Sequence, residues 1–253
     1  MNVPYCASLI DPGSRSSQED YVHLRPEKGI FILADGFGGP FAGAEAAKKA
    51  CELMDEFLFR QSRDADVTMP FVLRKYFSLA ANVVFNSVLY ANQHLYELNK
   101  RKNVNERGGS SAIVGLLDGD LLCIANVGVC SAWLIRQDLA TRLVLPRSYR
   151  RMLDPVGLDR PLKESYPEDH APLMAMGMYP DLEPEVIEYK MRPGDWLILH
   201  SDSLDFDRGS GLIEKVVAIK QKNITKEDSA RQVVNLIRSQ QFKDNLSLLL
   251  TIF

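Results

Sequence analysis

The hydrophobic period of the chain changes once, near residue 110, and this change most limits the possible folds. Before it, apolar residues recur every three or four positions over residues 43–58, and a longer apolar stretch extends from Pro70 towards Lys100. Both patterns are typical of helices. After it, residues 111–145 carry short segments of strand character separated by turns such as Asp118-Gly119-Asp120. Helices and strands therefore come in blocks, which favours an α+β fold with a mainly antiparallel core over a parallel, doubly wound sheet.

The same patterns predict the remaining elements. Strands are expected at residues 5–10, 21–24, 30–33, 111–117, 121–127, 130–136, 141–145, 186–190, 196–200 and 246–253. The four strands within 111–145 are expected to form one antiparallel meander, and two further helices are expected over 211–220 and 226–239. The proline-rich residues 146–180 are expected to form an irregular excursion beside the core. Because no repeat or Gly/Ser linker divides the chain, we predict a single domain over residues 1–253.

Composition is that of a globular protein without an electrostatic reason to bind nucleic acid. The chain has 30 Lys and Arg against 33 Asp and Glu, a formal charge of -3, and 46% hydrophobic residues. Residues 1–6 do not resemble a secretory signal, and no apolar run is long enough to span a membrane. We therefore expect a cytoplasmic monomer that binds neither nucleic acid nor membranes. Free, buried thiols are expected at all four cysteines, Cys6, Cys51, Cys123 and Cys130.

Several carboxylates fall at the predicted ends of strands, where an unpaired buried charge is costly. Glu19 and Asp20 begin a strand, Asp35 follows the apolar residues 30–34, Asp202 follows residues 196–201, and Asp244 precedes the last strand. Hard divalent cations such as Mg²⁺ and Mn²⁺ are natural partners because they take oxygen ligands. The glycines after Asp35 would also let a backbone carbonyl approach an ion. Taken singly, each of these acids also fits an ordinary turn or cap residue.

Six short motifs occur in a fixed order along the chain. They are Arg15 to Asp20 (Arg-Ser-Ser-Gln-Glu-Asp), Ala34 to Gly39 (Ala-Asp-Gly-Phe-Gly-Gly), Gly109-Ser110-Ser111, Ala125-Asn126-Val127-Gly128, Gly194-Asp195 with Ser201-Asp202, and Asp244-Asn245. Together they resemble the metal-dependent protein phosphatases, the type 2C serine/threonine phosphatase family. The resemblance covers about residues 6–253 and implies a four-layer αββα sandwich, in which helices flank two antiparallel sheets. It also implies hydrolysis of phosphoserine and phosphothreonine in proteins by attack of a metal-bridging water.

The resemblance also assigns roles to seven residues. It implies two ions, Mg²⁺ or Mn²⁺, bridged by Asp35. The Gly36 carbonyl and Glu19 would complete one metal site, and Asp202 and Asp244 would complete the other. Asp20 would hold metal-bound water, and Arg15 would bind the phosphate through its planar guanidinium.

Three positions depart from the family pattern. Phe37 stands where many members carry a histidine proposed as a general acid, so that role for a side chain is excluded there. Val129 replaces an aspartate associated with a third metal ion, which predicts a weak or absent third site and lower turnover. Ser203 replaces a glycine, and if that position needs a positive φ the backbone is strained by about 1–2 kcal/mol.

These departures leave two alternatives to an active protein phosphatase. One is a low-activity or inactive pseudophosphatase that serves as a phosphoprotein-binding module. The other is a metallohydrolase for a different phosphoester, because the same metal chemistry serves many esters.

Arginines and histidines outside these motifs have weaker signals. Four arginines in the excursion either are solvated or contact an acidic or phosphorylated substrate: Arg147, Arg150, Arg151 and Arg160. The histidines have no metal-ligand spacing and are expected to be structural: His23, His94, His170 and His200.

Overall fold

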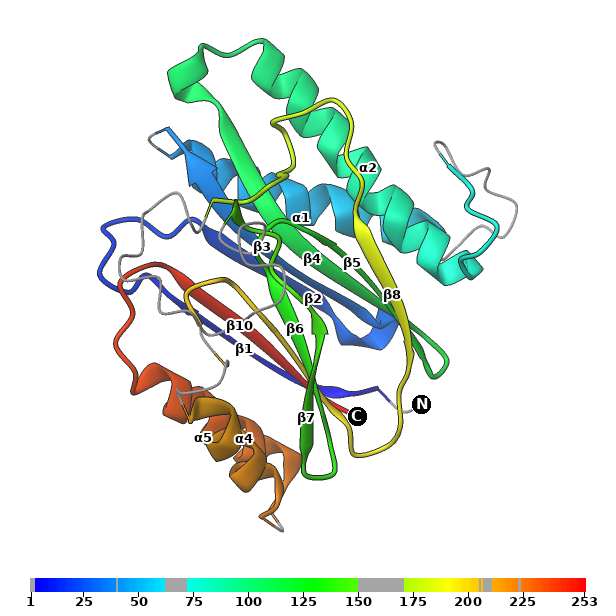
Figure 1. Ribbon diagram of the computed structural model, residues 1–253, viewed down its shortest axis with the longest axis vertical. Helices are drawn as coiled ribbons and strands as arrows, with labels where there is room; N and C mark the ends of the chain where they lie inside the picture. The colour runs from blue at the N-terminus through cyan, green and yellow to red at the C-terminus, as the bar shows by residue number, and fades with distance from the viewer. Residues whose placement is uncertain are drawn as a thin grey trace.

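Strands of the computed structural model form two five-stranded antiparallel sheets (Figure 1). The structure describes residues 3–39, 41–61, 72–149, 171–204, 206, 211–222 and 224–253. The first sheet has the order β1 (Tyr5–Asp11), β10 (Leu246–Ile252), β9 (Trp196–His200), β6 (Ser131–Arg136), β7 (Leu139–Val144). The second has the order β2 (Asp20–Arg25), β3 (Ile30–Gly38), β4 (Gly108–Asp118), β5 (Leu121–Val127), β8 (Glu185–Lys190). Two short 3₁₀ helices lie at Pro26–Lys28 and Val104–Glu106.

Three apolar cores separate four layers. Helices α1 (Ala42–Gln61) and α2 (Leu79–Lys100) pack on the outer face of the second sheet. Helices α4 (Leu212–Lys220) and α5 (Lys226–Arg238) pack on the outer face of the first, as Figure 1 shows. Between the sheets lies a core whose largest members include Phe31, Leu33 and Leu134. The predicted αββα sandwich is confirmed.

Helix α2 begins at Leu79, so the prediction of a helix from residue 70 onward is wrong for residues 72–78. The buried side chains of Asn82 and Asn86 explain the late start. The Asn82 amide accepts from the Arg74 N–H at 2.7 Å and donates to its carbonyl at 3.0 Å. The Asn86 amide likewise accepts from the Val72 N–H at 3.1 Å and donates to the Val72 carbonyl at 2.8 Å. These bonds occupy backbone groups that a preceding helical turn would need.

The predicted meander over residues 111–145 is also wrong. Strand β4 pairs with β5 in one sheet, whereas β6 pairs with β7 and β9 in the other. The chain crosses between the sheets at Gly128, whose φ of 91° is a conformation that glycine adopts without strain. A side chain at this position would also lie 2.2 Å from the Ser111 hydroxyl.

Strand β3 is longer than predicted, and the extension matters for the site. It continues through Asp35 and Gly36 to Gly38, because pairing with β4 persists as far as Gly108. Asp35 therefore lies inside a central strand and not after its end.

Several other expectations have outcomes in the described part of the chain. The cysteines are free, with Cys6 half-buried and the other three buried. Residues 146–148 and 171–184 contain neither helix nor strand, and they pair with other segments only through isolated bridges at Ser148–Pro172 and Ser110–Met176. Arg150, Arg151, Arg160 and His170 lie outside the described residues. No helix among the described residues is long and apolar enough to cross a membrane.

Candidate active site

Six of the seven predicted site residues line one pocket of about 550 Å³. They are Arg15, Glu19, Asp35, Gly36, Asp202 and Asp244. The second sheet supplies its site residues at the start of β2 and in the last part of β3. The first sheet supplies them just after β9 and just before β10. Because β9 and β10 are antiparallel neighbours, the end of one and the start of the other lie together.

The seventh residue, Asp20, lies buried beside this pocket. It is the direct cross-strand partner of Asp35, so the two carboxylates share one face of the sheet. Burial raises the pKa of Asp20 to about 7, although the hydroxyls of Ser247 and Ser201 oppose the shift. Its Oδ2 atom is buried and has no hydrogen-bond partner among the residues that the structure describes. Burial also raises the pKa of Asp35 well above its usual range, and repulsion by Asp20 adds to the effect.

Glu19 is positioned by Asn245, a residue to which the sequence analysis gave no role. The Asn245 carboxamide oxygen accepts from the Glu19 backbone N–H at 2.7 Å. Its nitrogen donates to the carbonyls of Ser17 at 2.8 Å and Pro12 at 3.0 Å. Asn245 thus fixes the loop between β1 and β2 to the start of β10. Its place directly after Asp244 in the last motif was the available signal.

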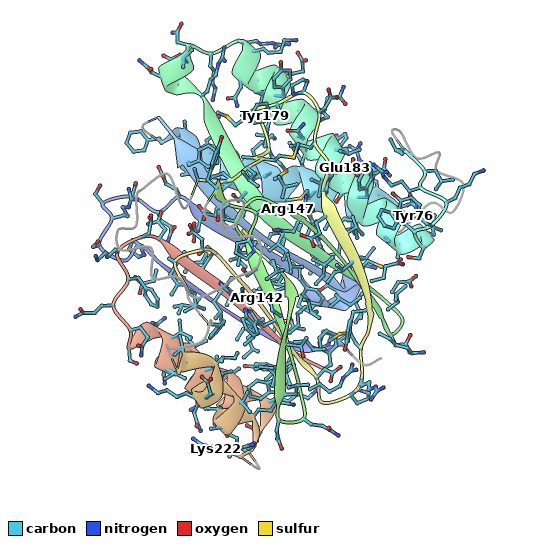
Figure 2. The ribbon with its side chains drawn as sticks, in the orientation of Figure 1. Tyr76, Arg142, Arg147, Tyr179, Glu183 and Lys222 are labelled. Carbon is cyan, nitrogen blue, oxygen red and sulfur yellow. The ribbon has the colours of Figure 1, made fainter. Side chains whose placement is uncertain are left out.

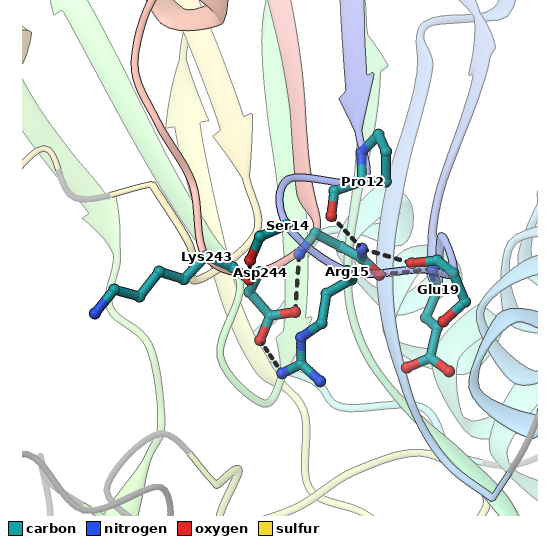
Figure 3. Close-up of polar contacts among 8 residues, drawn as sticks. Pro12, Ser14, Arg15, Glu19, Lys243 and Asp244 are labelled. Atoms are coloured by element: carbon teal, nitrogen blue, oxygen red, sulfur yellow. Dashed lines mark hydrogen bonds and ion pairs between the residues drawn. The ribbon is translucent and has the colours of Figure 1, made fainter.

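Arg15 and Asp244 contact each other in this structure (Figure 3). The Arg15 Nη2 atom donates to Asp244 Oδ2 at 2.7 Å, and this bond raises the pKa of Arg15. The other Asp244 oxygen accepts from the Asn245 backbone N–H at 2.8 Å. The pair is exposed, at 59% and 50% of the two side chains. The two side chains, for which the sequence predicts phosphate and metal binding, are thus hydrogen-bonded to each other.

The start of α1 packs tightly against the acidic part of the pocket. A Cβ atom at Gly36 would lie 2.1 Å from the Gly43 carbonyl oxygen and 2.8 Å from that of Glu19. A Cβ atom at Gly43 would lie 3.0 Å from the Glu19 carboxyl carbon. Only glycine fits at Gly36, and its N–H donates to the Glu19 carbonyl at 3.1 Å.

The donor set of this pocket fits hard divalent cations. It consists of carboxylate and carbonyl oxygens, which Mg²⁺ and Mn²⁺ prefer. The buried carboxyl of Asp20 and the half-buried carboxyl of Asp35 face like charges, so a cation would relieve their repulsion. Within the described residues, no three Asp, Glu, His or Cys side chains converge on one point at ligand distance. Metal binding therefore requires side chains such as Asp244 to turn from their present partners.

The three departures from the family pattern have different outcomes. Phe37 and Val129 both line the pocket. Val129 is buried, and its N–H donates to the Ser111 hydroxyl at 3.3 Å. The φ of Ser203 is not positive, so the strain expected if that position required a positive φ does not arise.

The described histidines and Arg147 contact protein groups outside the pocket. His23 lies 3.2 Å from Asp55, and Nδ1 of His94 lies 2.9 Å from the Tyr90 carbonyl. His200 is buried, with Nδ1 2.7 Å from the Ser201 carbonyl. These contacts agree with the expected structural roles. Arg147 pairs with Glu185 at 3.5 Å.

Comparisons with known proteins agree with the fold. The family model "Protein phosphatase 2C" matches residues 16–144. A putative protein phosphatase 2C-type of Streptococcus pyogenes is 24% identical over 93% of this chain and 92% of its own length. Protein phosphatase PhpP of Streptococcus pneumoniae is 23% identical over 96% of this chain and 94% of its own.

Solved structures share the fold. The Mycobacterium tuberculosis serine/threonine phosphatase PstP is 22% identical, covers 99% of both chains and superposes with a TM-score of 0.77. A structure of the PstP catalytic domain in complex with two manganese ions is 21% identical, with a TM-score of 0.76 and coverage of 99% of this chain and 98% of its own.

A four-layer sandwich with carboxylates gathered beside its two sheets is the architecture of a metal-dependent phosphatase. The family match spans half of the chain, and the chain belongs to the protein phosphatase 2C family of serine/threonine phosphatases.

Proposed function

We propose that this phosphatase hydrolyses phosphoserine and phosphothreonine monoesters of proteins, using two Mg²⁺ or Mn²⁺ ions held in the acidic pocket. The observation that carries the proposal is the gathering of five carboxylates with Arg15 in and beside one pocket. When bound, the two ions supply a nucleophile from water at neutral pH and neutralise charge on the phosphoryl oxygens.

The residues divide between metal binding and substrate binding. Asp35 would bridge the ions, with Glu19 and the Gly36 carbonyl on one side. Asp202 and Asp244 would hold the other ion. Asp20, behind Asp35, would accept hydrogen bonds from ordered water and orient it.

Arg15 would bind the phosphate once Asp244 turns to its ion. The present Arg15–Asp244 pair is exposed on both sides, and an exposed ion pair contributes at most about 1 kcal/mol. A dianionic phosphate ester offers the guanidinium a bidentate partner, which is a stronger acceptor arrangement. The pair is therefore easily exchanged when metal and substrate bind.

The direct test is hydrolysis of a phosphothreonine peptide by the purified protein. We expect turnover in Mn²⁺ or Mg²⁺ and its loss in excess EDTA, with recovery when the metal is restored. Absence of turnover in excess Mn²⁺ would refute the proposal.

Val129 is the observation that favours the second candidate, a phosphoprotein-binding module with little or no activity. The valine provides no ligand for a third ion. Calorimetric titration distinguishes the two functions, because tight Mn²⁺ and phosphopeptide binding without turnover would establish the module. In that case, activity gained on Val129→Asp would show that the missing carboxylate had limited catalysis.

We also propose that the protein acts as a monomer in a reducing compartment, the cytoplasm. Four free thiols support this, since free cysteines persist where glutathione and thioredoxin keep them reduced. Sedimentation of the purified protein tests the monomeric state, and fractionation of cells tests the location.

A further inference from the structure

The proposed phosphate chemistry uses only part of the lining of the active-site pocket. Its charged lining residues are Arg15 and four carboxylates, all assigned above to metal or phosphate binding. A further set of residues, which we name the apolar wall, lines the same pocket. The apolar wall consists of Phe37, Ala175, Met178 and Tyr179.

Contacts between distant segments build the apolar wall. The Phe37 ring and the Met178 side chain both lie on Gly109, where an added Cβ would approach them to 2.6 and 2.9 Å. Ser110 and Met176 exchange backbone hydrogen bonds of 3.1 and 2.9 Å, which join β4 to the irregular segment before β8. The end of β3 and this segment are thereby held at one place.

Buried asparagines of α2 fix the irregular segment. Asn92 donates to the carbonyls of Tyr179 and Pro180 at 3.0 and 3.2 Å and accepts from the Gly177 N–H at 2.8 Å. Asn99 donates to the Gly177 carbonyl at 2.8 Å. Both asparagines are at least 95% buried, so these bonds are sheltered from water.

The side chains of this fixed segment are nevertheless exposed. Met178 is 37% and Tyr179 is 54% exposed, and Figure 2 shows Tyr179 beside α2. Tyr179 also lines a second hollow of about 320 Å³, whose other lining residues are mostly apolar and include Leu173 and Pro180. Large apolar side chains held in a fixed position with open surface are typical of a ligand-binding site.

We propose that the apolar wall binds an apolar side chain next to the phosphorylated residue and so selects substrates by their flanking sequence. This inference rests on the proposed function. Consecutive residues of a peptide lie about 3.8 Å apart, so a phosphothreonine at Arg15 and the metal ions brings its neighbour into the same pocket. A polar or acidic neighbour would find no charged partner on the described part of the wall, whereas an apolar one buries surface there.

The test compares two phosphothreonine peptides that differ only in the flanking residues, which are leucine in one and serine in the other. We expect kcat/KM in Mn²⁺ to be about tenfold higher for the leucine peptide, the low end of what an apolar pocket discriminates, because the wall is partly open. The ratio should fall to about twofold or less in the double variant Met178→Ser, Tyr179→Ser.

A matched control is Tyr76→Ser. Tyr76 is 70% exposed, precedes α2 and does not line the pocket, so this variant should keep the wild-type ratio. Thermal unfolding of each variant checks folding, and Tyr179→Ser alone replaces the double variant should the latter unfold.

The outcomes separate this inference from the proposed function. Equal kcat/KM values for the two peptides, or a tenfold ratio that survives in the double variant, would overturn the inference alone. Peptide binding without hydrolysis would overturn the proposed function, and the same ratio measured in Kd would then decide on the apolar wall.

Discussion

Gly43 controls the position of the proposed metal ligand Glu19, and Gly43→Ala tests this directly. Gly43 is the second residue of α1, where alanine normally stabilises a helix by up to about 1 kcal/mol. In this structure the added Cβ would lie 2.9 Å from the Phe37 nitrogen and 3.0 Å from both the Glu19 carboxyl carbon and the Gly36 carbonyl carbon. Ordinary contacts are about 3.5–4.0 Å, so these groups must move by about 0.5 Å or more.

The expected effect follows from the nature of the displaced groups. Overpacking costs about 1–3 kcal/mol, and the helix gain offsets part of it, so the free energy of unfolding should fall by no more than about 2 kcal/mol. Two of the displaced groups are proposed to bind one ion, and misplacing ligands through a supporting residue typically weakens metal binding 10–100-fold. We expect a loss of Mn²⁺ affinity in this range, measured by calorimetry, in a protein that remains folded in urea titrations.

Gly115→Ala is the matched control, because it adds the same methyl group in β4, the strand that pairs with β3. There the new Cβ meets Leu122 and Phe31 at 3.6 Å, an ordinary contact. Its Mn²⁺ affinity should equal that of the wild type. Wild-type Mn²⁺ affinity in Gly43→Ala, or an equal loss in Gly115→Ala, would show that the packing of α1 does not position the site.

Three further predictions concern single groups. Asp35→Asn should abolish phosphopeptide turnover and leave the free energy of unfolding at pH 8 unchanged or higher, because it removes a half-buried carboxyl that neighbouring carboxylates repel; normal rates would show that Asp35 binds no essential ion. Arg15→Ala should raise KM for a phosphopeptide without weakening Mn²⁺ binding, because it frees Asp244; unchanged KM would argue against a phosphate role. Burial raises the pKa of Cys123 to about 11, so a thiol reagent at pH 8 should label it in urea but scarcely in the native state. The unfolded thiol loses its proton near pH 9, so this residue should also lower stability as pH rises from about 9 to 11; rapid native labelling would contradict its burial.

The sequence predicted elements whose limits are set by local chemistry. Strands β5 and β9 begin and end at the predicted residues, because apolar runs are bounded there by turn-forming residues. The start of α2 was not predictable in this way, since it depends on Asn82 and Asn86 reaching back to earlier backbone groups. The prediction of a single meander over residues 111–145 was wrong for a related reason. Local turn signals predict hairpins, but they do not reveal that the chain changes sheets at Gly128.

The candidate site shows the same division. The six lining residues were found because each stands in a short motif, and the order of the motifs carries the information. Asn245 and Gly43 act through contacts with Glu19, which lies more than 20 positions away along the chain from either, so spacing alone gives no signal. The single-domain organisation stays a prediction, as does the role of each site residue.

Phe37 and Val129, two departures from the family pattern, share a location in the structure. By comparison with the family pattern, Phe37 replaces a proposed general acid and Val129 replaces a ligand for a third metal ion. In the folded protein both line the active-site pocket, and Phe37 lies beside Gly109 together with Met178 of the apolar wall. A histidine or an aspartate at these places would bring polar groups into the pocket lining. The two replacements make the pocket lining more apolar, and we expect both reduced catalytic assistance and the proposed selection of apolar substrates to follow from them.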